Sequence, residues 1–279
     1  MKASLPLFLS ILLLGSCKLA DLQTDASQRN AQPEQAREWL ERMAEAHGID
    51  VLQSLDTYTV SMEDEFFGMM GGAISPYGDK LGKFTADYIP GTFDGRMTMS
   101  SGKLEGQTWG IQSWQTYTQQ AGQDKVWKQE DDAYFWLPTY QYFVEFPFRI
   151  LQADMLALAG EQTIMGKPCV GVLASWGQLA PQEETDQYLA WIDKETYQLV
   201  KLQYTVREAA GFMIGSALYR DYQDYGGLKL PSRMSVGSKA EEGKYMHEMR
   251  ILDFTPNALP VSELRPQPGL AIMGDAKPE

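Results

Sequence analysis

The chain has 279 residues, of which 24 are basic and 37 are acidic, so its formal net charge at pH 7 is −13. Such a surface repels phosphates, and no basic stripe interrupts it, which excludes nucleic acid as a partner. The chain holds only two cysteines and two histidines. A disulfide framework is therefore not expected, and histidine-based metal or triad chemistry is severely limited.

The N-terminus has the layout of a bacterial export signal. Lys2 precedes an apolar run over residues 5–14, and the run ends in Leu14-Gly15-Ser16-Cys17. This stretch resembles the lipobox of bacterial lipoproteins, which implies cleavage after residue 16 and acylation of Cys17. The alternatives are an accidental cysteine or an uncleaved membrane anchor, although ten apolar residues fall short of the roughly 20 that span a bilayer.

The elements after the signal follow in order. Residues 17–32 are polar and predict a lipidated tether. Pro33 then opens a helix whose apolar residues recur at three- and four-residue steps until Gly48 ends it. From Thr57 the pattern alternates, which is typical of half-buried strands separated by tight turns. Further alternating runs are Trp109/Ile111/Ser113, Val170/Val172/Ala174/Trp176, Val200/Leu202/Tyr204/Val206 and Tyr245/His247/Met249/Ile251.

One block departs from the strand pattern. Eight of the fifteen residues 134–148 are aromatic. The block suits one or two short helices, broken at Pro138 and Pro147, that cover or fill the concave side of the sheet. We therefore predict one α+β domain, mostly antiparallel β, in which an incomplete curled barrel wraps around the N-terminal helix and this mid-chain helical insert.

The order of these elements resembles that of the periplasmic lipoprotein carriers of the LolA/LolB type. The local patterns that carry the likeness are Gly160-Glu161-Gln162-Thr163-Ile164-Met165-Gly166-Lys167-Pro168-Cys169, Trp191-Ile192-Asp193-Lys194-Glu195-Thr196 and Gly227-Leu228-Lys229-Leu230-Pro231. The resemblance assigns residues 33–258 to a LolA/LolB-like open barrel and leaves 259–279 as a C-terminal extension. It implies an apolar cavity for acyl chains between sheet and helices.

Chemistry beyond apolar binding is not indicated. The His-Glu-x-x-His, Gly-x-Ser-x-Gly and phosphate-loop motifs are absent, and the one formal Ser-x-x-Lys match, Ser100 to Lys103, is attributed to chance because it lies in a turn, so we expect no enzyme, no cofactor and no metal. His247 falls on an apolar strand face, which is typical of a core histidine, and His47 at a helix end is expected to meet free carbonyls or solvent. Cys169 suits a buried small hydrophobe. The acidic clusters 63–65, 130–132 and Glu183-Glu184 are interpreted as solvated turns, with calcium binding the alternative.

The predicted function is that of a lipid-anchored envelope protein that binds an apolar ligand, such as an acyl chain or the lipid moiety of a lipoprotein. Its expected place is the periplasmic face of the outer membrane, because the residue after Cys17 is Lys18 and not the aspartate associated with inner-membrane retention. The alternatives are an envelope scaffold or sensor that binds another protein, and a hydrolase of envelope lipid or glycan. The candidate ligand-binding residues are Tyr58, Val60, Trp109, Trp136, Phe143, Phe146 and Tyr204.

Two glycine-rich stretches are unusually apolar for connections between strands. They contain Phe66, Phe67, Met69 and Met70, and then Phe212 and Met213. Exposed, they would meet a membrane or a protein partner. Folded inward, they would join the core. Methionine in either place suits contact with varied acyl chains, since its side chain is unbranched and polarizable.

Overall fold

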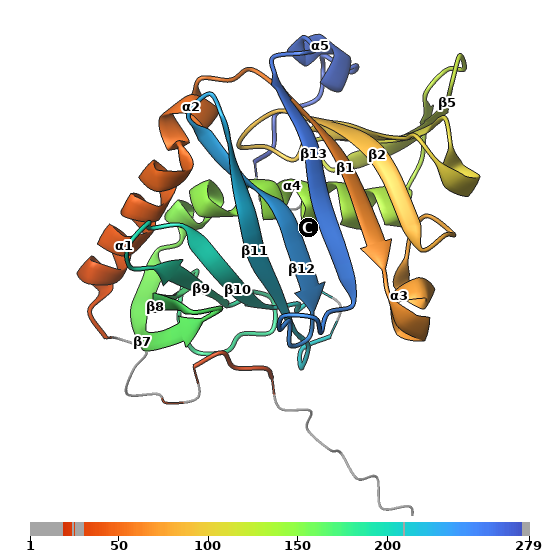
Figure 1. The fold of residues 1–279 in the computed structure, drawn as a ribbon. Helices are drawn as coiled ribbons and strands as arrows, with labels where there is room; N and C mark the ends of the chain where they lie inside the picture. The colour runs from red at the N-terminus through yellow and green to blue at the C-terminus, as the bar shows by residue number, and fades with distance from the viewer. Residues whose placement is uncertain (1–18, 24, 26–30, 209, 275–279) are drawn as a thin grey trace, which may run out of the picture.

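The computed structural model describes residues 19–23, 25, 31–208 and 210–274. The strands of this part form one antiparallel sheet in the order β6-β5-β4-β3-β2-β1-β13-β12-β11-β10-β9-β8-β7. The sheet curls around helix α4 and does not close, because β6 and β7 are its two edges (Figure 1). The predicted α+β class and open curled barrel are confirmed.

The helical elements are α1 (Pro33–His47), α2 (Ile49–Gln53), α3 (Gly68–Ile74), η2 (Gly102–Leu104), α4 (Asp131–Arg149), η3 (Ile150–Gln152) and α5 (Val261–Leu264). The first part of the sheet comprises β1 (Tyr58–Phe66), β2 (Leu81–Tyr88), β3 (Gly95–Met99), β4 (Gln107–Gln112), β5 (Gln115–Gln120) and β6 (Val126–Trp127). The second part comprises β7 (Met155–Ile164), β8 (Lys167–Ser175), β9 (Tyr188–Asp193), β10 (Leu199–Thr205), β11 (Ile214–Tyr225), β12 (Leu228–Gly237) and β13 (His247–Pro256).

Two strands far apart in the sequence join the two parts. β1 pairs with β13 from Tyr58 opposite Pro256 to Phe66 opposite His247, with one bulge between Ser61 and Met62. All other strand pairs are between neighbours along the chain. The β1–β13 pairing is therefore the link that turns two separate meanders into one sheet.

The main core lies between the concave face of the sheet and the helices. The alternation predicted for β1 is confirmed, since every second residue from Tyr58 to Phe66 is buried. Helix α1 adds Leu40 and Met43 to the same core and packs along β7 and β8 at one edge (Figure 1). A second, smaller cluster, which includes Leu173, Leu189 and Trp191, covers β7–β10 on the opposite face.

Helix α1 ends as predicted, and the reason is steric as well as conformational. Gly48 has φ of +88°, and a Cβ there would lie 2.1 Å from the carbonyl oxygen of Gly227. Next to it His47 is buried and does not meet solvent. Its Nδ1 donates to the Lys229 carbonyl at 3.1 Å and its Nε2 accepts from the Leu199 amide at 3.1 Å, so the ring joins α1 to β12 and β10.

The mid-chain block forms one helix of 19 residues and not two short ones. Both Pro138 and Pro147 lie inside it, so each removes one backbone hydrogen bond. The carbonyl of Phe143, which Pro147 deprives of its helical donor, accepts a hydrogen bond of 3.2 Å from the Tyr219 hydroxyl of β11. Sheet contacts thus stabilise a helix that its own sequence interrupts.

Candidate functional site

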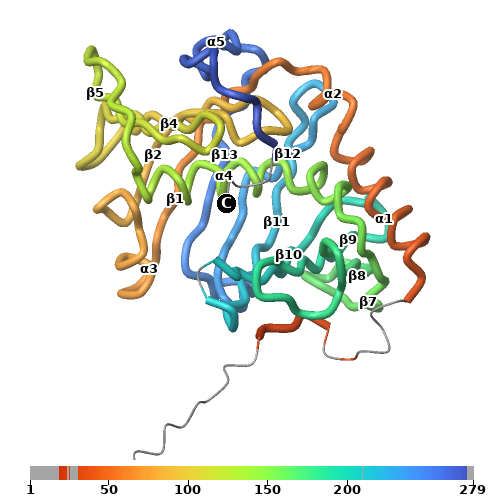
Figure 2. Tube along the Cα trace, turned by 180° about the vertical axis from the view of Figure 1, so that it is seen from behind, coloured from red at the N-terminus to blue at the C-terminus, as the bar shows by residue number. Residues whose placement is uncertain are grey.

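Helix α4 crosses the concave face of the sheet along most of its width (Figure 2). Its inward residues are mainly aromatic or aliphatic, and Leu137, Tyr140, Phe143 and Phe146 are all buried. Because the sheet bends around this helix, the apolar side chains of the helix and of the concave face bury each other. Any ligand held between sheet and helix must compete with these side chains for space.

The structure brings the seven candidate ligand residues into this interior. Tyr58 and Val60 lie on β1, Trp109 on β4, Tyr204 on β10, and the remaining three on α4. Five of them are buried core residues: Tyr58, Val60, Trp109, Phe143 and Phe146. The other two, Trp136 and Tyr204, are half-buried and pack against that core. They do not form one site, however, since α4 separates the residues of β1 and β4 from that of β10.

On the β1 side, α4 carries a buried ion pair between two of its own residues, and other groups bind this pair. Arg149 Nη2 lies 2.9 Å from a carboxylate oxygen of Glu145, and both side chains are at most 2% exposed. The Tyr58 hydroxyl donates to the same carboxylate at 2.7 Å, and the Gly91 amide donates to it at 3.2 Å. Arg149 also donates to the Thr92 carbonyl at 2.6 Å. Charged groups buried in this way are stable only with their partners in place.

A second buried network holds the N-terminal half of α4 to the same strand. The Tyr140 hydroxyl donates to Asp64 of β1 at 2.7 Å and also contacts the Tyr77 hydroxyl. His247 Nδ1 lies 2.8 Å from the other Asp64 oxygen, and Phe66 stacks on its ring at 4.7 Å between centroids. Burial and the neighbouring carboxylate raise the pKa of Tyr140 well above its ordinary value, so it acts as a hydrogen donor.

This network corrects one interpretation and agrees with another. The run 63–65 belongs to β1, and Asp64 is fully buried beneath α4, so the expectation of a solvated turn is wrong there. His247 is a core histidine with a partner, as its strand face indicated. The alternation of Tyr58, Val60 and Met62 continues to Asp64 and is the signal for its burial, but the charged neighbours Glu63 and Glu65 favour the interpretation as a turn.

On the β8–β11 side, α4 meets the sheet through aromatic rings. Tyr188 of β9 lies 5.5 Å from Tyr142, 5.9 Å from Phe146 and 6.0 Å from Trp176, measured between ring centroids. Tyr204 of β10 lies 5.7 Å from Phe143 in an edge-to-face contact. We call these residues the aromatic seam: Tyr142, Phe143, Phe146, Trp176, Tyr188 and Tyr204.

The aromatic seam is neutral and lies partly at the surface. Tyr142, Trp176, Tyr188 and Tyr204 are half-buried. Burial raises the pKa of Tyr188 and Tyr204 above the ordinary tyrosine value, so their hydroxyls stay protonated. The seam differs from the β1 side in chemistry: rings and neutral hydroxyls make its contacts, whereas Asp64, Glu145 and Arg149 make those on the other side.

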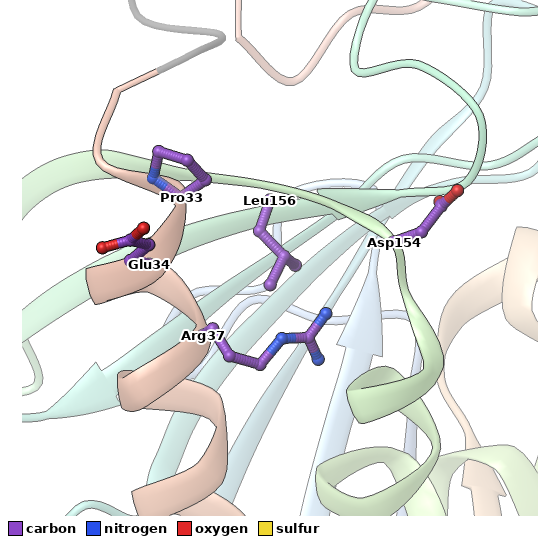
Figure 3. Close-up of a pocket in the computed structure, with 5 residues that line it drawn as sticks. All are labelled: Pro33, Glu34, Arg37, Asp154 and Leu156. Atoms are coloured by element: carbon purple, nitrogen blue, oxygen red, sulfur yellow. The ribbon is translucent and has the colours of Figure 1, made fainter.

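Two of the surface pockets in the described part of the chain lie outside this interior, and neither is lined by the candidate residues. The first, of about 320 Å³, lies between the start of α1 and the start of β7 and is lined by Pro33, Glu34, Arg37, Asp154 and Leu156 (Figure 3). Arg37 is held there by the Leu151 carbonyl at 2.6 Å. The second, also about 320 Å³, lies at the β12–β13 connection. With charged groups in the lining of each, these pockets do not suit an acyl chain.

The six residues of the two apolar stretches differ in exposure. Phe66 is buried and Phe67 is half-buried. The four other side chains are exposed: Met69 by 90%, Met70 by 74%, Phe212 by 62% and Met213 by 42%. Inward folding thus holds for Phe66 alone among the predicted contact residues. Cys17, the predicted acylation site, lies outside the described residues.

Sequence reasoning missed three residues that define the interior. The sequence pattern indicates no role for Glu145, which lies within the aromatic block, or for Arg149, and it predicts no strand at Tyr188. The spacing of Glu145 and Arg149, four residues apart on a helix, was the one signal that could have found the ion pair.

No helix of the described residues is long and apolar enough to cross a membrane.

Comparison with known proteins gives a likeness of structure and none of sequence. No family model matches the chain, and no curated protein does either. Among solved structures, a DUF1329 family protein from Desulfovibrio piger has a TM-score of 0.55 at 9% identity and covers 84% of this chain and 97% of its own.

Two further structures carry names that bear on the fold. A putative outer membrane lipoprotein-sorting protein domain from Vibrio parahaemolyticus has a TM-score of 0.53 at 10% identity and covers 83% of this chain and 97% of its own. A LolA superfamily protein from Nitrosomonas europaea has a TM-score of 0.51 at 10% identity and covers 82% of this chain and 96% of its own. The chain therefore has a LolA-like fold, an open curled sheet around a mid-chain helix.

Proposed function

We propose that this chain is a non-enzymatic, lipid-anchored envelope protein that binds an acyl chain in the aromatic seam, between α4 and strands β8–β10. The observation that carries the proposal is the asymmetry of α4. Its contacts with β1 include hydrogen bonds from tyrosine hydroxyls to the buried carboxylates of Glu145 and Asp64, whereas its contacts with β9 and β10 are made by aromatic rings. A hydrocarbon can replace ring contacts without stranding a charge, but it cannot replace an ion pair in this way.

The ligand enters this seam from the surface in our proposal. The half-buried rings of Trp176, Tyr188 and Tyr204 give it a first apolar contact, and further burial against Phe143 and Phe146 supplies the affinity. Burial stabilises by roughly 25 cal/mol per Å² of apolar area, so an acyl chain needs no ionic partner. In this proposal Tyr58, Val60 and Trp109 pack in the core on the β1 side of α4 and do not contact the ligand directly.

The names of two structurally similar proteins support this class of ligand. One is described as a lipoprotein-sorting protein domain and the other as a LolA superfamily protein. In the same proposal Cys17 carries the lipid anchor, and the protein resides at the periplasmic face of the outer membrane.

A second candidate is an envelope scaffold or sensor that binds another protein. The observation that favours it is the filling of the interior by α4 and its aromatic side chains. In that case the aromatic seam is purely structural. The two candidates differ in whether the purified protein takes up lipid.

Photo-crosslinking with a diazirine analogue of palmitate tests the proposal. Peptide mass spectrometry is expected to find the label on Tyr204, Tyr188 or Trp176. Extraction of the purified protein with organic solvent, followed by mass spectrometry, checks for lipid acquired in the cell. Label confined to the outer face of the sheet, or no label at all, would contradict ligand binding in the seam and favour the scaffold.

A pair of variants on one strand provides the matched control. Tyr204→Glu places a carboxylate in the aromatic seam and is expected to abolish labelling. Gln203→Glu makes the same change in charge on the opposite face of β10, where the Gln203 oxygen accepts from Trp191 Nε1 at 2.9 Å, and should leave labelling unchanged. Equal labelling of the two variants would refute the assigned site.

A further inference from the structure

Alternate connections of the sheet lie at the same end of the molecule. In an antiparallel meander, alternate turns share one end, and this rule places the β1–β2, β8–β9, β10–β11 and β12–β13 connections together, along with β3–β4 and β5–β6. Contacts between them agree: the Phe67 amide donates to the Met246 carbonyl at 2.8 Å, and the Ala240 amide donates to Ser216 Oγ at 2.6 Å. Helix α3, within the first connection, occupies the same lower end of the molecule in Figure 1.

The exposed residues of the two apolar stretches project from this end. Met69 and Met70 belong to α3, and Phe212 and Met213 to the β10–β11 connection. Four large apolar side chains exposed by 42–90% on two connections at one end are unusual, because loops in contact with water alone are mostly polar. Position and chemistry together mark this end as a contact surface.

The described residues that follow the predicted anchor dock at the same place. The Ala20 amide donates to the Gly211 carbonyl at 2.8 Å, and Arg207 Nη2 donates to the Ala20 carbonyl at 2.6 Å. The Leu22 amide donates to Gln187 Oε1 at 2.9 Å. Residues 19–22 were expected to belong to a tether, but they are bound to the β8–β9 and β10–β11 connections (Figure 1).

This docking limits where an anchor at Cys17 can lie. Two peptide units separate Cys17 from Leu19, so their Cα atoms are at most about 7–8 Å apart. The Leu19 side chain reaches to within 2.8 Å of where a Cβ on Gly211 would lie, and Phe212 and Met213 follow directly. In the proposed lipoprotein, the residue that carries the acyl chain thus precedes by two positions a residue that lies against the β10–β11 connection.

We infer that this end of the molecule rests on the bilayer, with Phe212 and Met213 inserted in the leaflet that holds the acyl anchor and Met69 and Met70 at its surface. The inference rests on the proposed lipid anchor. It concerns the orientation of the domain. Because residues 19–22 are bound to the domain, the connections at this end face the membrane and the domain does not rotate freely about its anchor.

Charge does not drive this contact. Residues 67–80, 206–213 and 237–246 together carry four basic and four acidic side chains, and the β8–β9 connection adds Glu183, Glu184 and Asp186. An acidic surface gains nothing from anionic lipid. Insertion of apolar side chains is the contributing force, so vesicles of phosphatidylcholine alone should suffice.

The test uses the full chain, processed through its own signal, purified in detergent and reconstituted into phosphatidylcholine vesicles. An NBD fluorophore is attached through Phe212→Cys, or through Leu252→Cys as the control. Leu252 is 56% exposed, close to the 62% of Phe212, but it lies within β13, five residues from the strand end at His247. Five residues of strand correspond to roughly 17 Å. Cys169 is fully buried and should not react.

Nitroxide-labelled lipid is expected to quench the fluorophore at position 212 and not at position 252. Ala20→Pro removes the amide that binds Gly211, and should reduce quenching at 212 while the protein still floats with the vesicles. Flotation with no difference between the two positions would overturn the orientation but leave the anchor standing. Failure to float would instead refute the lipid anchor, and with it this orientation, while ligand binding in the aromatic seam is tested separately by the crosslinking.

Discussion

Replacing Arg149 by methionine is expected to destabilise the fold by several kcal/mol. The substitution keeps the length of the side chain and removes its charge, which leaves the Glu145 carboxylate buried without its cation. Removal of one partner of a buried ion pair typically costs about 3–5 kcal/mol. The Tyr58 hydroxyl and the Gly91 amide still donate to this carboxylate, so we expect the lower end of that range, about 3 kcal/mol.

Urea denaturation, followed by tryptophan fluorescence and far-ultraviolet circular dichroism, measures this loss. With a urea m-value of about 3 kcal/mol per M, at the upper end of the usual range for small proteins, the midpoint falls by about 1 M. The chain offers a matched control, because Glu38 and Arg42 form a pair with the same spacing on α1, and both side chains are about half exposed. Arg42→Met should leave the midpoint unchanged, since exposed pairs contribute little.

A double variant separates the stranded charge from lost packing. Glu145→Gln removes the carboxylate, so adding it to Arg149→Met is expected to recover part of the loss. If Arg149→Met and Arg42→Met shift the midpoint equally, or if the double variant is less stable than Arg149→Met, the role assigned to the ion pair is refuted.

Three more outcomes follow from individual residues. Burial lowers the pKa of His47 from 6.5 to about 4, so on acidification the unfolded chain binds a proton before the folded chain does. The contribution of His47 to the free energy of unfolding is therefore fully present above pH 6.5 and falls by about 3 kcal/mol toward pH 4. Urea midpoints at pH 7, 6 and 5 should show this decline, and it should be smaller in His47→Gln. Gly48→Ala should destabilise far more than Gly122→Ala in the same titration, because both have positive φ but only the first Cβ collides with Gly227; equal losses would contradict the clash. Burial also raises the pKa of Cys169 to about 11, so a maleimide should label it in urea but not in the native protein, and rapid native labelling would show that it is exposed.

The fold could be predicted from the sequence where local pattern and tertiary contacts agree. Helix α1 has Pro33 at its start and Gly48 at its end, and β1 alternates regularly from Tyr58, so both appear where expected. Helix α4 shows the limit. Pro138 and Pro147 are local signals for breaks, but the Tyr219 hydroxyl of a distant strand supplies a partner to the carbonyl that Pro147 frees, and the helix continues.

The interior was harder to predict because its decisive groups lie far apart in the sequence. Asp64 and His247 are 183 residues apart and meet through the pairing of β1 with β13. The aromatic composition of α4 indicated that it covers the sheet, but not that one side is fastened by charges and the other packed by rings. That difference depends on which strands face Glu145 and Tyr142, and residue type alone does not reveal it.

The joining of β1 to β13 has a consequence for how this chain acquires its shape. Tyr58 pairs with Pro256, so β1 can pair with β2 early but can pair with its second neighbour, β13, only after the last strand is present. Contacts of such long range slow folding, since most of the polypeptide must be present before they form. In the export that we propose, the N-terminus leaves first, so α4 is released well ahead of β13 and its aromatic side chains are exposed to water in the meantime. We expect the emerging chain to depend on a chaperone until its final strand is free.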